Sequence, residues 1–302
     1  ATSDRLTIMR LTHGLAVWTM VGCTALWSMA GVVTRHLEQA RSFEVTFWRS
    51  FFTVASLLVI LPLWQGRSVW SRLPLRSRYF WYSGICWSVM FTAFMVALTL
   101  TAVANVLITM AVGPLLTALI TRVFLGHRLP ARTWVAIALA GIGIAWMYGS
   151  QLSLGDPNFL IGSLVALCVP IAGSVQWTLT QKSQSEGQSL DLVPSVMLGA
   201  LMSTLLTLPM SMPFQASAHD VGLLALLGLF QLAIPCALSV VCARVLKAPE
   251  VALLALLEIV FGIALAWWGA NEAPQLSVLF GGALVLGALL LNEWLGWRQN
   301  NV

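Results

Sequence analysis

Long runs of residues without Asp, Glu, Lys or Arg dominate the chain. One run extends from Gly14 to Thr34, and the longest, from Tyr79 to Thr121, has room for two helices joined by a tight turn near Thr99–Thr101. A helix needs about 20 mostly apolar residues to cross the hydrocarbon layer of a membrane. The pattern therefore predicts a bundle of membrane-spanning helices.

Ten ranges have the required length and apolar character, and only two of them contain a charged residue away from their ends. The interruptions are Arg49 in the second range and Glu258 in the ninth. The expected spans are about 14–34, 43–66, 79–98, 102–122, 133–150, 157–181, 192–212, 221–243, 251–271 and 273–292. The fold class that follows is an all-α integral membrane protein with ten transmembrane helices. Kinks are expected at Gly113-Pro114, Pro170 and Pro235, because proline removes a backbone hydrogen bond.

One stretch of the chain occurs twice in weakly similar form. Ala104 to Trp134 reads as an apolar helix, a turn and the start of a second helix, and Ala248 to Ser277 repeats this pattern about 145 residues later. We therefore expect two five-helix repeats, at 1–150 and 151–302. An odd number of spans per repeat makes the second copy enter the membrane from the opposite side, an inverted arrangement that is typical of secondary transporters.

The composition supports a membrane protein and sets its expected orientation. Hydrophobic residues make up 59% of the chain and charged residues 9%, whereas soluble domains carry about a quarter charged residues. With the N-terminus in the cytoplasm, only Arg35 and Arg41 face outward, and the positive-inside rule favours this placement. The cytoplasmic basic residues would be Arg5, Arg10, Arg67, Arg72, Arg76, Arg78, Arg122, Arg128, Arg132, Lys182, Arg244, Lys247 and Arg298. We expect a multi-pass protein of the bacterial inner membrane, with both termini cytoplasmic.

The same residues argue against several other classes of protein. The net charge of +5 follows from the loop bias, so no nucleic-acid partner is expected. All five cysteines fall inside expected spans, which argues against a disulfide framework. The four histidines lie at span ends or in loops, and this excludes a zinc protease of the HExxH type. We expect no catalytic residues, metal or cofactor. The partners would be the lipid bilayer and a small-molecule substrate, and a monomer is compatible with this picture.

Arg49 and Glu258 are the charged residues that the expected spans contain away from their ends. Each costs about 2.5–3.5 kcal/mol on an insertion scale, so both should face protein or water rather than lipid. Glu258 could be a coupling site or a ligand for a substrate ammonium group. Alternatively, the two residues could neutralise each other and hold the halves together, although their depths in the membrane differ by about 10 Å.

Neutral polar and aromatic side chains near the expected midplane could line a cavity between the repeats. Packing against neighbouring helices is the alternative for each of them. A cavity of aromatic and neutral polar groups suits a partly apolar, amphipathic solute. The candidate substrate-binding residues are Trp27, Ser28, Trp87, Thr92, Asn105, Thr109, Gln176, Trp177, Thr180, Gln231 and Ser239.

Several short motifs, taken in order, resemble the EamA-type ten-helix exporters of the drug/metabolite transporter superfamily. They are Leu26-Trp27-Ser28, Phe47-Trp48-Arg49, Gly126-His127, Glu258-Ile259 and Asn271-Glu272. Two of them depart from the family pattern, because His127 stands where the family has an acid and Ile259 where it often has proline. The resemblance implies export of amino acids and other small metabolites, and the Trp-rich lining is similar to that of the aromatic amino acid exporter branch.

We therefore expect a secondary transporter that exports small amphipathic metabolites, above all aromatic and other neutral amino acids, by alternating access. An efflux carrier for organic cations is the alternative within transport, because Trp faces hold cations by cation–π attraction. A membrane enzyme or a non-transporting subunit is the alternative from another class. Short loops leave an enzyme little room for a catalytic cluster.

Overall fold

The chain is almost entirely helical. A computed structural model describes residues 12–126, 131–152, 157–186 and 190–300. Helices hold 84% of the residues and the described part contains no strand, which confirms the all-α class. Some residues used in the sequence analysis lie outside the described part: Arg5, Arg10, His127 and Arg128.

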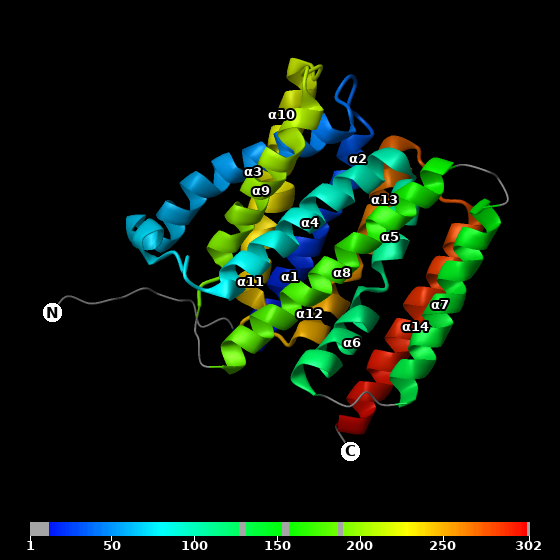
Figure 1. The fold of residues 1–302 in the computed structure, drawn as a ribbon. Helices are drawn as coiled ribbons and strands as arrows, with labels where there is room; N and C mark the ends of the chain where they lie inside the picture. The colour runs from blue at the N-terminus through cyan, green and yellow to red at the C-terminus, as the bar shows by residue number, and fades with distance from the viewer. Residues whose placement is uncertain (1–11, 127–130, 153–156, 187–189, 301–302) are drawn as a thin grey trace.

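The helices follow one another with short connections, as Figure 1 shows. The first half contains α1 (His13–Trp27), α2 (Met29–Thr34), α3 (Ser42–Gln65), η1 (Arg67–Arg72), α4 (Arg78–Leu100), α5 (Val103–Met110), α6 (Gly113–Leu125) and α7 (Ala131–Leu152). The second half contains α8 (Pro157–Ser185), α9 (Val193–Ser211), α10 (Ala218–Leu226), η2 (Leu227–Ala233), α11 (Ile234–Cys242), α12 (Ala248–Ala255), α13 (Leu257–Ala270) and α14 (Leu276–Asn300).

Eight helices or helix pairs of the described part are long and apolar enough to cross a membrane. They match the expected spans except the fifth and the tenth, whose apolar helices are shorter, at Trp134–Gly143 and Leu276–Ala288. These two lie on α7 and α14, which pack against each other at one side of the bundle (Figure 1). The chain is therefore a multi-pass membrane protein, and ten crossings stay a prediction.

The duplicated stretch forms a broken helix in both halves. In the first copy α5 ends at Met110 and α6 begins at Gly113, which confirms the expected interruption at Gly113-Pro114. In the second copy the break falls at Leu256, between α12 and α13, where the sequence contains no glycine or proline. By contrast, α8 continues without a break across Pro170. The two breaks place helix ends at corresponding positions in the two duplicated stretches.

Two glycines let helices of opposite halves approach closely. A Cβ atom on Gly199 of α9 would lie 2.3 Å from the Trp87 Cβ and 2.9 Å from the Gly84 carbonyl oxygen of α4. A Cβ atom on Gly228 of η2 would lie 2.9 Å from the Arg49 carbonyl oxygen of α3. Such contacts allow backbone-to-backbone packing, which small residues favour between membrane helices. The halves are thus joined by two close crossings.

Replacing Gly199 with Ala is expected to destabilise the bundle. The added methyl group would overlap Trp87 and force α4 and α9 apart, and overpacking of this kind costs about 1–3 kcal/mol. Gly222→Ala is the matched control, because a Cβ atom there meets nothing within 4 Å. Thermal unfolding in detergent should show a lower midpoint for Gly199→Ala only. An equal midpoint for both variants would contradict a tight crossing.

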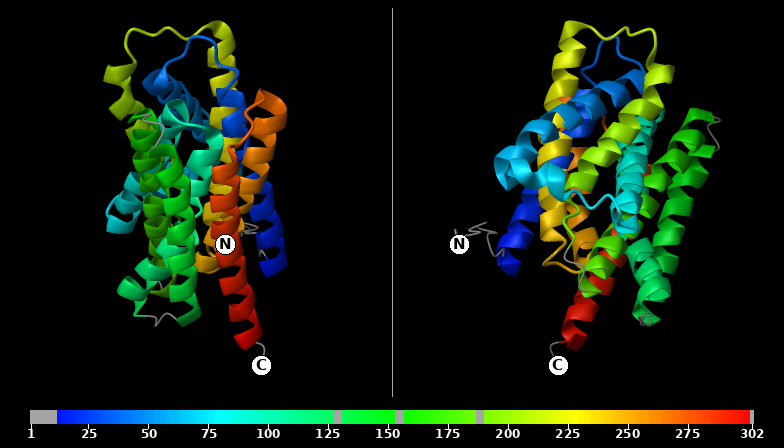
Figure 2. Two further views of the ribbon diagram at one scale, coloured as in Figure 1. Left: turned by 90° about the vertical axis from the view of Figure 1, so that its right-hand side faces the viewer. Right: turned by 60° about the vertical axis from the view of Figure 1, so that its left-hand side comes forward.

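The two ends of the bundle differ in their polar contacts. We call the end where α1 begins and α14 ends the terminal end, and the end where α2 and α13 end the distal end (Figure 2). At the distal end the Asp220 carboxylate accepts hydrogen bonds from the backbone N–H groups of Glu38, Gln39 and Ala40, at 2.8–2.9 Å. The Glu44 carboxylate in turn accepts from backbone N–H groups of the α9–α10 connection. The α2–α3 and α9–α10 connections run side by side in Figure 2, and these hydrogen bonds hold them together.

Candidate functional site

A cavity of about 130 Å³ lies at the breaks of the two duplicated helices. Met110, Gly113 and Pro114 line it at the α5–α6 break, and Leu256 and Glu258 line it at the α12–α13 break. Helices α1, α3, α4, α8, η2 and α11 complete the wall. Residues of both halves therefore surround one central space, as the duplication predicts for a solute site.

Aromatic rings form much of this wall. Trp87, Met90, Phe91 and Phe94 recur at helical spacing on one face of α4 and all line the cavity. The Trp87 ring packs edge-on against Trp177 of α8, with ring centroids 5.9 Å apart and planes at 86°. These rings give the cavity a rigid apolar surface for a flat or partly apolar solute.

Arg49 supplies a positive charge to the cavity wall. Its side chain is fully shielded from solvent at 0% exposure, which requires polar partners for the guanidinium. Nη1 donates to Oε1 of Gln231 at 3.0 Å, and Nη2 donates to the carbonyl oxygen of Phe91 at 2.6 Å. Nε is buried without a hydrogen-bond partner. The guanidinium is therefore held by two neutral acceptors and no carboxylate.

Glu258 supplies a carboxylate to the same cavity. It lies in the first turn of α13, directly after the break at Leu256, where a helix N-terminus favours a negative charge. Its side chain is 7% exposed and forms no hydrogen bond or ion pair with the described residues. The neutralising pair with Arg49, left open by the sequence, is absent among the described ion pairs. Arg49 and Glu258 therefore line one cavity without a direct ion pair between them.

Six of the predicted residues line the cavity: Trp27, Arg49, Trp87, Trp177, Gln231 and Glu258. The others lie outside the lining, and their side chains bond within or between helices. Ser28, Thr109, Thr180 and Ser239 each donate to a carbonyl oxygen of their own helix or of the helix before it. A substrate role for these residues stays a prediction.

Three further candidates outside the lining make hydrogen bonds between side chains. Thr92 of α4 bonds Ser203 of α9 at 2.8 Å, and Gln176 of α8 accepts from Ser83 of α4 at 2.8 Å. The Asn105 amide donates to Thr101, one turn earlier, at 3.1 Å. The first two bonds tie neighbouring helices together, which is the packing alternative that the sequence left open.

Several lining residues were not among the sequence candidates. Phe91 and Phe94 share a face of α4 with Trp87, so helical spacing contained a usable signal for them. Thr117 and Ser174 also line the cavity, where Thr117 donates to Ser174 at 3.0 Å between α6 and α8. Nothing in the sequence points to this pair, because its members are brought together only by packing of the two helices.

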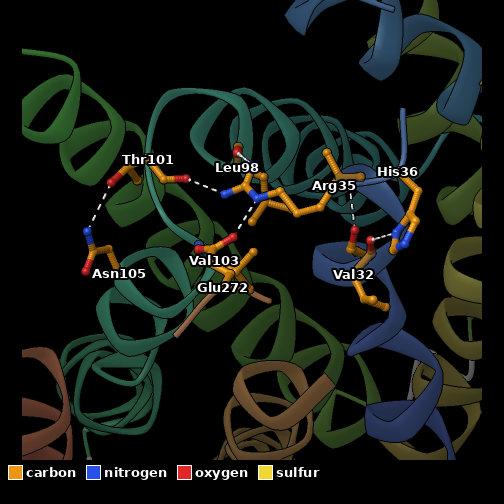
Figure 3. A network of polar contacts seen from close by, with 10 residues as sticks. Val32, Arg35, His36, Leu98, Thr101, Val103, Asn105 and Glu272 are labelled. Atoms are coloured by element: carbon orange, nitrogen blue, oxygen red, sulfur yellow. Dashed lines mark hydrogen bonds and ion pairs between the residues drawn. The ribbon is translucent and has the colours of Figure 1, made fainter. Parts of the chain in front are cut away.

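A polar network closes the bundle at the distal end (Figure 3). We call it the distal network: Arg35, Leu98, Thr101, Val103 and Glu272. The Glu272 carboxylate accepts from Arg35 Nε and from the Val103 backbone N–H, both at 2.6 Å. Arg35 also donates to the carbonyl oxygens of Leu98, at 2.8 Å, and Thr101, at 3.0 Å. Arg35 thus provides donors for backbone carbonyl groups at the end of α4, and Glu272 provides an acceptor for a backbone N–H group at the start of α5. The network also joins the first half of the chain to the α13–α14 connection.

Comparisons with known proteins agree with this architecture. Residues 14–149 match the model of the EamA-like transporter family. No curated protein matches the chain. Among solved structures 23 chains match, and one of these, described only as "Crystal structure of protein", aligns with a TM-score of 0.64 and 21% sequence identity. That alignment covers 95% of this chain and 99% of the other, so the two share a fold along nearly their whole length.

The family match covers the first copy of the duplicated stretch, and the shared fold extends across both copies. The description of the matched family names it as a family of transporters. A membrane-embedded transporter acts on a small molecule within the lipid bilayer. The match over residues 14–149 shows that the first half of this multi-pass membrane protein is similar to the EamA-like transporter family.

Proposed function

We propose that the chain is a secondary transporter that exports small amphipathic metabolites, with aromatic and other neutral amino acids as its substrates. The observation that carries the proposal is one central cavity lined by tryptophans, by Arg49 and by Glu258. An aromatic amino acid has a flat apolar side chain, a carboxylate and an ammonium group. Each of these groups has a chemical counterpart in the lining.

Alternating access through this cavity follows from the proposed architecture. The cavity lies between two repeats, 1–150 and 151–302, in ten membrane crossings with the second repeat inverted. The helix breaks at Ala111 and Leu256 support this arrangement, because they fall at corresponding places in the duplicated stretches. Both termini would lie in the cytoplasm of a bacterial cell, with the distal network on the outer side of the inner membrane.

Flux into proteoliposomes tests the proposal directly. The purified chain, reconstituted in lipid vesicles, should accumulate labelled Trp and Phe faster than protein-free vesicles do, and faster than it accumulates Thr. Adding a pH gradient separates coupled transport from facilitated diffusion, because only coupled transport depends on the gradient. Absence of flux for every amino acid would contradict the substrate class, and equal flux with and without the gradient would exclude proton coupling.

Efflux of organic cations is a second candidate, favoured by the Glu258 carboxylate, which lines the cavity and forms no hydrogen bond or ion pair with the described residues. A buried carboxylate attracts an ammonium group strongly, because little water screens the charge. Trp27, Trp87 and Trp177 would hold a flat cation by its face. An amino acid has a carboxylate for Arg49 to bind, whereas an organic amine has none. Dependence of transport on Arg49 therefore distinguishes the two candidate functions.

A further inference from the structure

The guanidinium of Arg49 has an incomplete set of hydrogen-bond partners. It is fully shielded from solvent, two neutral oxygens accept from Nη1 and Nη2, and Nε has no acceptor. A buried cation is costly unless an anion and further hydrogen bonds compensate it. No carboxylate of the described residues pairs with Arg49, although Arg49 lines the cavity. Glu258 lines the same cavity without a direct ion pair to Arg49, so the guanidinium lacks a carboxylate in hydrogen-bond contact among the described residues.

Gln231 reaches Arg49 from an unusual backbone segment. It lies in η2, a π-helix of seven residues, a form that is rare and frequently found at functional sites. This segment rests on the turn of α3 that carries Arg49, because Gly228 has no side chain to separate the two backbones. Thr53 of α3 donates to the Gly228 carbonyl oxygen at 3.2 Å. The π-helix is thus fixed against Arg49 by backbone contacts.

The orientation of the Gln231 amide is set at both of its ends. Its oxygen accepts from Arg49, while its nitrogen lies 3.5 Å from the carbonyl oxygen of Trp27, at the end of α1. A reversed amide would place its N–H donors against the guanidinium, which itself has only donors. Gln231 therefore offers Arg49 an acceptor in a fixed direction, and it adds no charge that would compete with a ligand.

We propose that Arg49 binds the carboxylate of the transported solute and that Gln231 is the positioning residue that orients Arg49 for this contact. The proposal rests on the proposed function, because it assigns the cavity to a solute. A carboxylate beside Arg49 supplies a charged acceptor, whereas the Gln231 amide and the Phe91 carbonyl supply only neutral ones. Phosphorylated solutes fit less well, since Arg49 is the only cation among the described lining residues.

Binding of tryptophan and tryptamine tests the assignment, because tryptamine is tryptophan without its carboxylate. The full chain in detergent is titrated with each labelled compound. For the unchanged chain we expect tryptophan to bind about tenfold more tightly than tryptamine. Gln231→Glu places a carboxylate against Arg49, so affinity for tryptophan should fall about tenfold or more while affinity for tryptamine does not fall.

Gln176→Glu is the matched control, since Gln176 is a buried amide on α8 outside the cavity lining. A general effect of a new buried charge would change both affinities equally and leave their ratio unaltered, as we expect for this control. Should Gln231→Glu not fold, Gln231→Met removes the acceptor without adding charge. It should bring the two affinities close together.

The outcomes separate this inference from the proposed function. If the unchanged chain binds neither compound, the aromatic amino acid class fails before any variant is compared, and the carboxylate assignment fails with it. If the unchanged chain prefers tryptophan but Gln231→Glu and Gln231→Met keep that preference, the positioning role of Gln231 is overturned while the proposed function stands.

Discussion

Replacing Glu258 with Gln is expected to lower the rate of tryptamine transport more than about tenfold. The rate of tryptophan transport should fall by a smaller factor. Gln keeps the size and polarity of Glu but removes its charge. Tryptamine would lose its only charged partner in the described lining, whereas tryptophan would still be held by Arg49 through its carboxylate. Initial rates of uptake into proteoliposomes, measured over a range of concentrations for each compound, give the two losses.

Glu250→Gln is the matched control for this change. Glu250 lies on α12, close in sequence to the break, but its side chain is 33% exposed and pairs with His13 outside the cavity lining. The control should leave both rates near those of the unchanged chain, because exposed ion pairs contribute about 0–1 kcal/mol. Equal losses of tryptamine and tryptophan for Glu258→Gln would contradict separate sites for the two charges. Undiminished tryptamine transport would exclude Glu258 as the cation partner.

The helical architecture could be predicted from the sequence because each element depends mainly on its own residues. A charge-free run of about 20 residues has few alternatives to a membrane helix, since lipid offers no partners for backbone groups. The break at Gly113-Pro114 was also predictable, because proline removes a backbone hydrogen bond in its own helix. The break at Leu256 contains no such residue, whereas the π-helix at Leu227–Ala233 ends just before Pro235, where a kink was expected. No residue at Leu256 predicts its break, so the contacts of α12 and α13 with neighbouring helices must decide it, and one sequence does not show these contacts.

The residues of the candidate site also differ in whether local sequence or packing between helices determines their role. Arg49 and Glu258 could be singled out because a charge within an apolar span is costly wherever the helix packs. Whether they pair with each other depends on rotation and depth of two distant helices, and in the structure Arg49 instead meets Gln231, 182 positions away in the chain. Thr92 and Gln176 were candidates because they are polar side chains near the expected midplane, where an unpaired amide is costly. Depth does not tell which side of a helix faces the cavity, and both side chains bond neighbouring helices.

Joining positions 35 and 272 by a reversible cross-link is expected to stop transport completely. The Arg35 and Glu272 side chains meet in the distal network, with Nε and Oε2 2.6 Å apart, and they connect α2 to the α13–α14 connection (Figure 3). Solute that leaves the cavity at the distal end must pass between the halves that this network joins. A variant with Arg35→Cys and Glu272→Cys, in a chain whose native cysteines are replaced by Ala, can be bridged by a cleavable bifunctional thiol reagent. Flux should fall to the level of protein-free vesicles and return when a reductant cleaves the bridge.

Two controls distinguish a closed exit from chemical damage. Either single cysteine variant treated with the same reagent cannot form the bridge, so its flux should change little. Reductant should also restore flux in the bridged protein, because cleavage returns the freedom of the two halves without refolding. If mass spectrometry shows complete bridging and flux continues, the distal network does not separate during transport. The solute would then have to leave by a route that keeps α2 and the α13–α14 connection together, which is incompatible with alternating access through this end of the bundle.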